Sequence, residues 1–478
     1  MLKEELRKRA RSMVKIPADF QTIIEEYADG ENGDGEAMFS WINEERDEGI
    51  TVKLDLEGNL TSLTIDMNHS HTNEINLSVE ERQERAEQFL LLHYPNALED
   101  LTFYEMKKLN DAYRFYYERI VMDLPLKHAG SLIDVDSEGN IVKFSYKAAL
   151  EIPEIPTTLI QKEKLIEHVH NRLDFQQTIT NLYTNLHHVA EDGIRLVYEP
   201  EPSFMTYKAD VLSPTLSIVH DEDVQENYVS LQPPPNTAAQ KDLSLETIIG
   251  ITEGMEMIRE VDMGEEKGVV WRDRNWKMED HDLSMDSFFK RHSEDTVKAF
   301  ISKKTGIVRS FVWFNERSGN LKLTREECLV KAIDFLQTIL PDYDKYLQLM
   351  VRDSEEEFED TRKKEVFSFR VHNGKGIPVQ LEIVVVAVNR ETGLVDHYSG
   401  PSMDIEQLSE ISTEPAISKN EARDIFFNHL DFELSWNKDY GGESESYILV
   451  YQACDRYSRT PIRYIDARTG EVITAKDK

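Results

Sequence analysis

The sequence predicts a mixed α+β protein, a tandem array of about six units in which one helix packs on an antiparallel sheet. Three patterns support this prediction. Glycine hairpins and helix-capping signals both recur about every 80 residues, and alternating apolar segments lie between them. The period places the units at 1–72 (divergent), 73–152, 153–238 (degenerate), 239–318, 319–408 and 409–478.

The hairpin signal is a strand, a short turn that contains glycine, and a second strand. Glycine provides the positive φ that such a turn requires. The copies contain, in order, Gly58, Gly139, Gly306, Gly393 and Gly470. Because the gap between Gly139 and Gly306 is about two periods, we predict a degenerate copy without its glycine near residue 222.

Helix starts keep the same period. Ser78, Thr158, Thr324 and Ser418 are each followed three positions later by Glu or Gln, which is the pattern of a capping box. Ser244 opens a weaker version of the signal. After Thr324 the apolar residues follow helical spacing, which predicts one buried helix face.

Segments with period-two alternation predict strands that have one buried face and one exposed face. They include Phe367, Phe369 and Val371, and also Tyr113 to Tyr117 and Tyr447 to Tyr451. Proline-rich joints at 153–156 and 233–235 separate units, and 401–417 reads as a further linker. Residues 353–364 read as a charged loop between two strands.

Charge limits the partners. With 55 basic and 90 acidic residues, the formal net charge is −35. Such a field repels phosphate backbones and anionic lipids, so we expect no nucleic-acid and no membrane partner. It favours a basic protein or peptide partner and a monomeric state.

Localisation follows from short apolar runs and few cysteines. The longest apolar run, 383–388, is far below the ~20 residues of a membrane span, and no apolar signal-peptide core follows the basic start. The two cysteines, Cys328 and Cys454, form no disulfide framework and no zinc pattern. We expect a cytoplasmic protein, with Cys328 as a buried, inert thiol on a helix.

Candidate metal ligands read as structural residues. Residues 134–141 resemble the first half of a calcium loop, but Ser145 stands where a bidentate Glu is required. We therefore predict an Asp-rich turn. Histidines pair at His69/His71, His168/His170 and His187/His188 without a metal-binding spacing. His93 and His429 lie on apolar helix faces, but Ile339 holds the same place in a sister helix, which favours a packing role.

Catalytic and cofactor motifs are missing from the sequence. It contains no GxSxG elbow, no P-loop and no GxGxxG. Trp271, Trp276 and Trp313 fall on strand-like stretches, where core packing is the default role. We predict no catalytic, cofactor-binding or metal-binding residues, and therefore no enzyme.

Two stretches resemble the YcdB/YcdC repeat family and the related PepSY domain. Residues 113–126 (YRFYYERIVMDLPL) precede 133–144 (IDVDSEGNIVKF), and 367–378 (FSFRVHNGKGIP) precedes the Gly393 hairpin. The shared pattern is an aromatic strand, a Gly/Pro turn and a glycine hairpin. The resemblance implies a PepSY-like or cystatin-like α+β unit. PepSY modules of protease propeptides are associated with inhibition and assisted folding of the attached peptidase.

Three functions stay open from the sequence. The first is a non-catalytic scaffold that binds and regulates a protein or peptide. The second, implied by the resemblance, is an inhibitor or folding assistant of a separate peptidase. The third is an enzyme whose site lies between repeats, marked by a polar pocket with perturbed carboxylates.

Overall fold

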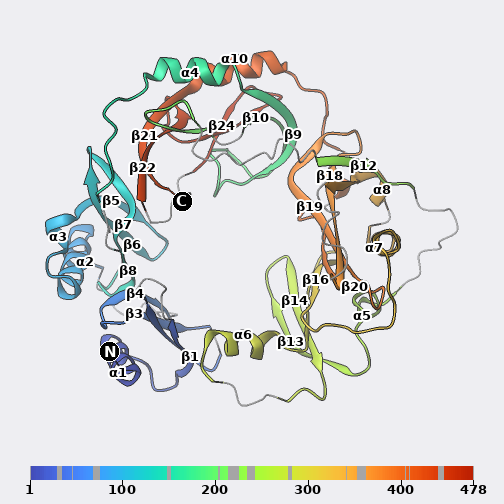
Figure 1. The fold of residues 1–478 in the computed structure, drawn as a ribbon, viewed down its shortest axis with the longest axis horizontal. Helices are drawn as coiled ribbons and strands as arrows, with labels where there is room; N and C mark the ends of the chain where they lie inside the picture. The colour runs from blue at the N-terminus through green and yellow to red at the C-terminus, as the bar shows by residue number, and fades with distance from the viewer. Residues whose placement is uncertain are drawn as a thin grey trace.

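The computed structural model shows a strand-rich α+β protein whose elements are arranged in a ring (Figure 1). It describes residues 2–28, 35–45, 47–67, 76–147, 152–202, 205–213, 226–233, 243–277, 282–340, 342–352, 362–403, 405–408, 410–439 and 446–476. Within these ranges, two large sheets contain all 24 strands. Figure 1 shows helices such as α2, α4, α7 and α10 on the outer side of the strands.

The first sheet has 11 described strands, in the order β1-β2-β3-β4-β8-β7-β21-β22-β11, with β6 and β5 attached at β7. From the first third of the chain it takes β1 (Gln21–Ala28), β2 (Glu36–Ile42), β3 (Gly49–Asp55), β4 (Leu60–Asp66), β5 (Thr102–Lys108), β6 (Ala112–Val121), β7 (Leu124–Asp136) and β8 (Ile141–Lys147). It also takes β11 (Thr206–Lys208), β21 (Leu430–Asp439) and β22 (Ser446–Asp455). The apolar faces of α1 (Lys3–Met13), α2 (Val79–His93) and α3 (Ala97–Asp100) pack on β1–β8.

The second sheet has 13 described strands, in the order β13-β14-β15-β16-β20-β19-β9-β10-β23-β24, with β18, β17 and β12 attached at β19. Their bounds are β9 (Asp174–Leu182), β10 (Gly193–Glu201), β12 (Glu226–Ser230), β13 (Met255–Asp262), β14 (Glu266–Asp273), β15 (Thr296–Ser302), β16 (Val308–Trp313), β17 (Leu347–Arg352), β18 (Lys364–His372), β19 (Pro378–Asn389), β20 (Val395–Ser399), β23 (Ile462–Asp466) and β24 (Val472–Thr474). The accompanying helices are α5 (Leu245–Ile249), α6 (Met285–Ser293), α7 (Arg325–Ile339), α8 (Tyr343–Tyr346) and α9 (Ile405–Leu408).

The two sheets exchange strands, so the helix-on-sheet units predicted from the sequence merge into two large sheets. After α4 (Lys162–His170), β9 pairs in parallel with β19 through Ile179 and Val379. After α10 (Lys419–His429), β21 pairs in parallel with β7 through Trp436 and Leu126. In addition β11 pairs with β22, and β23 pairs with β10. Each sheet is therefore completed by strands from the other half of the chain.

The ring closes where an insertion meets the first strand. The connection between β14 and β15 contains α6, whereas the corresponding connection between β2 and β3 is short. The N–H of Glu25 donates to the carbonyl of Leu283 at 2.7 Å, and the N–H of Met285 donates to the Glu26 carboxylate at 2.7 Å. The outer edge of β1 is thus covered by residues from the other half.

Most of the local predictions are confirmed. Capping boxes form at Ser78, Thr324 and Ser418, and Ser244 caps α5. Thr158 is not a cap, because α4 begins at Lys162 after Gln161 and has no side-chain cap. The five hairpin glycines all have positive φ. Residue 222, residues 353–361 and the His69/His71 pair lie outside the described residues.

Candidate functional site

An open groove of ≈ 860 Å³ lies beside the seam where β23 pairs with β10. Three segments that are far apart in the sequence line it: residues 191–196 at the start of β10, residues 407–412 after α9, and the β23–β24 hairpin at 466–469. The carbonyl of Leu196 accepts from the N–H of Ala467 at 3.0 Å, which joins the first and third segments. The strand exchange therefore creates the groove.

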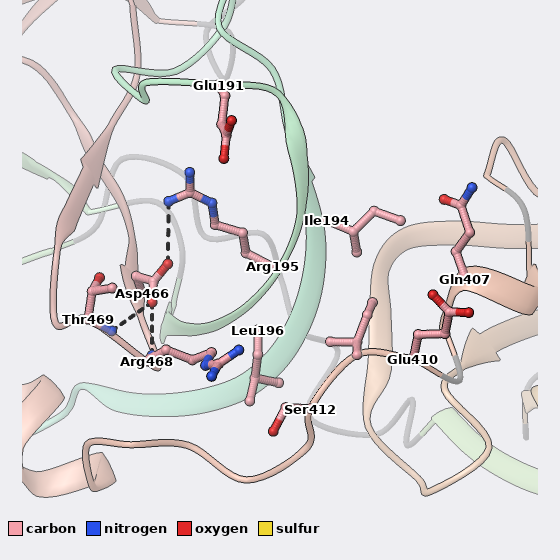
Figure 2. A pocket seen from close by; sticks show the side chains of 11 residues that line it. Glu191, Ile194, Arg195, Leu196, Gln407, Glu410, Ser412, Asp466, Arg468 and Thr469 are labelled. Atoms are coloured by element: carbon pink, nitrogen blue, oxygen red, sulfur yellow. Dashed lines mark hydrogen bonds and ion pairs between the residues drawn. The ribbon is translucent and has the colours of Figure 1, made fainter.

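The hairpin wall is held by a carboxylate. Asp466 ends β23 and accepts the N–H groups of Arg468 at 2.8 Å and Thr469 at 2.9 Å (Figure 2). Its second oxygen lies 3.5 Å from Nη1 of Arg195, which is also 3.5 Å from the Glu471 carboxylate. Because Asp466 is buried and doubly engaged, it is a structural group that orients Arg195.

The rest of the lining combines two exposed acids with apolar and polar side chains and one exposed cation, Arg468 of the hairpin. Glu191 and Glu410 are exposed on the two sides of the groove (Figure 2). Ile194, Leu196 and Ile411 supply apolar surface between them. Among the described lining residues, the Ser412 hydroxyl is not accompanied by a histidine or cysteine, which nucleophilic catalysis would use. The arrangement suits binding of a segment that carries basic and apolar side chains.

The calcium-loop resemblance is an Asp-rich turn between two strands, β7 and β8. Asp134 receives the Arg114 guanidinium at 2.7 and 2.8 Å. Asp136 accepts the N–H groups of Glu138 at 2.9 Å and Asn140 at 2.8 Å. Both carboxylates already have strong partners, as the sequence reading proposed.

The two singled-out histidines pack against aromatic rings. The His93 ring lies 4.6 Å from the Phe89 ring and 6.1 Å from the Phe144 ring, and burial, with a smaller effect of Arg9, lowers its pKa. His429 packs on the Tyr457 ring at 5.0 Å. Its Nδ1 also lies 2.7 Å from the Asp455 carboxylate, a polar contact that the sequence reading missed.

His168 and His170 lie on α4, on different sides of the helix. His168 packs on the Tyr207 ring at 5.7 Å, and His170 packs on the Phe427 ring at 4.6 Å. His187 packs near Tyr464 at 6.0 Å. Within the described ranges, no group of three His, Cys, Asp or Glu side chains is arranged to hold a metal ion.

Both cysteines are buried free thiols. Cys328 lies on α7, and burial raises its pKa, while burial raises the pKa of Cys454 to about 11. Both are therefore protonated at neutral pH, and a protonated thiol is a poor nucleophile. Trp271 and Trp313 are buried strand residues, but Trp276 lies in a turn under the Arg272 guanidinium at 4.0 Å, which corrects the strand prediction.

Sequence reasoning did not find the groove. Asp466 belongs to the Gly470 hairpin, so the turn was visible, but its partner Arg195 lies 271 positions earlier in the chain. No spacing rule connects two positions so far apart.

None of the helices described in the structure is both long and apolar enough to cross a membrane.

Comparison with known proteins supplies a family. The sequence profile of the YcdB, YcdC repeated domain matches residues 3–148 and 238–402, which contain β1–β8 and β13–β20. The chain is 30% identical to the uncharacterized protein YcdB of Bacillus subtilis (strain 168) over 476 residues, which is 98% of each chain. It is 29% identical to YcdC of the same strain over 456 residues, which is 95% of this chain and 96% of YcdC.

Among solved structures, the Bacillus megaterium YpeB C-terminal domain aligns with 49% of this chain and 94% of its own, at a TM-score of 0.24 and 14% identity. At that level the alignment carries no argument about architecture or function. The sequence profile and the near-full-length relatives together show that the chain belongs to the YcdB/YcdC repeated-domain family.

Proposed function

We propose that the protein is a non-catalytic scaffold that binds a basic segment of a partner protein in the groove beside the seam of β10 and β23. The observation that carries the proposal is the composition of the groove, in which exposed Glu191 and Glu410 flank the apolar surface of Ile194, Leu196 and Ile411. Carboxylates on a groove wall attract basic side chains, and the apolar floor adds affinity through burial.

The charge of the whole chain supports the same partner chemistry. A net charge of −35 attracts a basic segment over distances comparable with the Debye length. Asp466 and Glu471 balance the charge of Arg195. Arg468 adds one exposed positive charge on the hairpin side, so the attraction comes from the sides that carry Glu191 and Glu410. The same net charge supports a monomeric state, since two copies repel one another.

Binding of a defined probe tests the proposal. The probe is a fluorescein-labelled eight-residue peptide of alternating lysine and leucine, measured by fluorescence anisotropy at low ionic strength. The double variant Glu191→Gln/Glu410→Gln should bind it about tenfold more weakly, because two attractive charges are lost. A matched control, Glu253→Gln/Glu256→Gln, removes the same net charge from exposed positions outside the groove lining and should retain the affinity.

Equal weakening by both double variants would overturn the proposal, because binding would then follow net charge alone. Equal affinity of both variants and the unmodified protein would also overturn it, because the groove would then contribute nothing. As a control on the charge of the ligand, a peptide of alternating glutamate and leucine should bind the unmodified protein far more weakly than the lysine-leucine peptide.

We further propose a cytoplasmic location and an origin from six repeated units with the boundaries expected from the sequence. Two buried free thiols support the location, because reducing compartments preserve them. The recurrence of one capped helix followed by antiparallel strands, as at α2, α7 and α10, supports the six units. Deletion of one whole expected unit should unfold its sheet partners, because strands are shared.

A further inference from the structure

The two family-matched regions contain the same run of elements, which permits a position-by-position comparison. In the first half α2, α3, β5, β6, β7 and β8 follow one another, and in the second half α7, α8, β17, β18, β19 and β20 do. The helix ends match closely: Tyr94 closes α2 at φ −134° and ψ 82°, and Leu340 closes α7 at φ −132° and ψ 81°. The segment from Leu101 therefore corresponds to the segment from Leu347.

In the second half, the outer edge of β17 is covered by a strand of the same chain. The short strand β12 pairs antiparallel with β17, with Ser230 opposite Gln348 and Tyr228 opposite Met350. Behind β17, Arg370 of β18 donates to the Gln348 side chain at 2.8 Å and lies 3.4 Å from the centre of the Tyr228 ring. The added strand is thus held by backbone pairing and by one charged group that reaches it across β17.

In the first half, the corresponding edge is open. Within the described residues β5 pairs with β6 alone, and six of its seven residues are exposed. Phe103, Tyr104 and Met106 are 39%, 48% and 39% exposed. A terminal strand with exposed aromatic residues is a template for addition of another strand.

The group that corresponds to Arg370 is Glu118. Thr102 pairs with Glu118 on β6 as Gln348 pairs with Arg370 on β18. Glu118 is only 9% exposed, and its Oε2 is buried without a hydrogen-bond partner among the described residues. Lys127 and the His128 N–H already act on the Glu118 carboxylate. A buried carboxylate oxygen without a donor is nevertheless costly, so Oε2 calls for a further cationic or N–H partner.

From this correspondence we propose that the open edge of β5 binds an extended segment of a basic partner protein as an added antiparallel strand. The partner places a lysine or arginine within reach of Glu118, beside Tyr104, near the position that Tyr228 holds opposite Met350. Unlike β17, β5 has a bulge at Tyr104, between Phe103 and Glu105, so the two edges correspond position by position only up to Phe103. In the second half, the long cation Arg370 lies on β18 and reaches past β17 to Tyr228 on the added strand β12. At β5 the order is reversed, because Glu118 is short and the partner's side chain is long enough to reach it.

A second copy of this chain is a poor occupant, since two molecules of net charge −35 repel each other. The β5 edge is distinct from the groove beside β10, because the two sites share no lining residue. Its test is therefore independent of the groove, and either site can fail alone.

The test uses peptides derived from β12. The probe is a labelled peptide of residues 226–232 in which Tyr228 is replaced by lysine, and the matched peptide carries glutamate at that place. Anisotropy at low ionic strength should show the lysine peptide binding at least about tenfold more tightly. Glu118→Gln should remove about tenfold of that affinity, whereas Glu99→Gln on nearby α3, which has the same charge change, should not. The groove variant Glu191→Gln/Glu410→Gln should retain it.

Register is tested by a disulfide cross-link, which does not depend on Glu118. Because both native cysteines are buried, Tyr104→Cys introduces a reactive thiol at the edge. A peptide with cysteine at the Tyr228 place should cross-link to it under mild oxidation. Met350→Cys, the corresponding position that β12 covers, is the matched control and should react much less. Equal binding of the lysine and glutamate peptides, or equal cross-linking of the two cysteine variants, would overturn the proposal.

Discussion

The indole Nε1 of Trp436 donates a 3.0 Å hydrogen bond to the carbonyl of Val121, 315 positions earlier in the chain. Trp436 lies on the exchanged strand β21 and is completely buried. Tyr447, on the neighbouring strand β22, donates to the carbonyl of Lys127 at 2.9 Å in an exposed position. These contacts attach the end of the chain to the first sheet.

Trp436→Phe should therefore weaken the whole first sheet. The change removes the hydrogen bond, leaves the Val121 carbonyl without its donor and creates a cavity. Together these effects should lower the free energy of unfolding by about 2–4 kcal/mol. Chemical denaturation followed by far-UV circular dichroism measures it. Tyr447→Phe is the control and should cost less than about 1 kcal/mol, because water replaces the lost partner. Similar losses for both variants would contradict this account.

A buried carboxylate on β20 holds the connection between β16 and α7. Asp396 is fully buried and receives the Arg317 guanidinium, the Lys364 ammonium at 3.0 Å and the Asn389 amide at 3.1 Å. Asp396→Ala should destabilise the protein by about 3–5 kcal/mol, because two buried or half-buried cations lose their partner. Denaturant midpoints measure the effect. Glu316→Gln, in the exposed pair with Lys363, should leave the midpoint unchanged.

His93 should behave as a packing residue whose protonation opposes folding. His93→Leu should change stability by less than about 1.5 kcal/mol at pH 8, because the volumes are similar. Burial lowers the pKa of His93, so the unfolded chain binds more protons as pH falls below about 6.5. The unmodified protein should thus lose stability toward pH 5, and the leucine variant should lose less. Zinc or copper that bound the protein and was lost with this change would refute the packing role.

Glu118 should make stability depend on pH in the opposite direction. Burial raises the pKa of Glu118 to about 7, with a smaller raising effect of Glu105 against lowering effects of Lys127 and the His128 N–H. The native state then holds a proton that the unfolded state has released, so stability falls as pH rises between about 4.5 and 7. Glu118→Gln should remove this slope and be more stable than the unmodified protein at pH 8 by on the order of 1 kcal/mol. Parallel pH profiles for the two proteins would contradict the assignment.

Salt should stabilise the isolated protein. The net charge of −35 repels itself across the shared sheets, and ions screen this repulsion with a Debye length of about 8 Å at 0.15 M. We expect the melting temperature to rise between about 10 and 300 mM salt, while binding of the lysine-leucine peptide weakens. A flat or falling melting temperature would mean that local pairs, such as Arg114 with Asp134, already neutralise the acidic surface.

Short-range elements were readable from the sequence because their causes are local. Ser78 and Glu81 cap the same helix three positions apart, and Gly139 sets a turn by its own backbone geometry. The exchange was not readable, because β9 and β19 meet through the single parallel pair Ile179 and Val379. The pattern around Ile179 is equally compatible with pairing inside its own unit.

The candidate sites were hidden for the same reason. Arg195 and Asp466 meet only after the exchange. Glu118 reads as one of many acids in an alternating strand, and its unpartnered oxygen follows from burial that the sequence does not display. The comparison of β5 with β17 depends on the structure, because the strand that covers β17 is β12, which precedes the proline-rich joint at 233–235 and is far from β17 in the sequence.

The exchanged strands also impose an order on biosynthesis. On the ribosome, β9 emerges about 200 residues before β19, its parallel neighbour in the second sheet, and at roughly 5–20 residues per second the wait lasts about ten seconds or more. During that interval β9 and β10 have each other as native partners, but Ile179 lacks Val379 on β19, and Val197 lacks Asp466 on β23. The nascent chain thus carries the β9–β10 hairpin without its neighbours in the second sheet until β19 and β23 have been made.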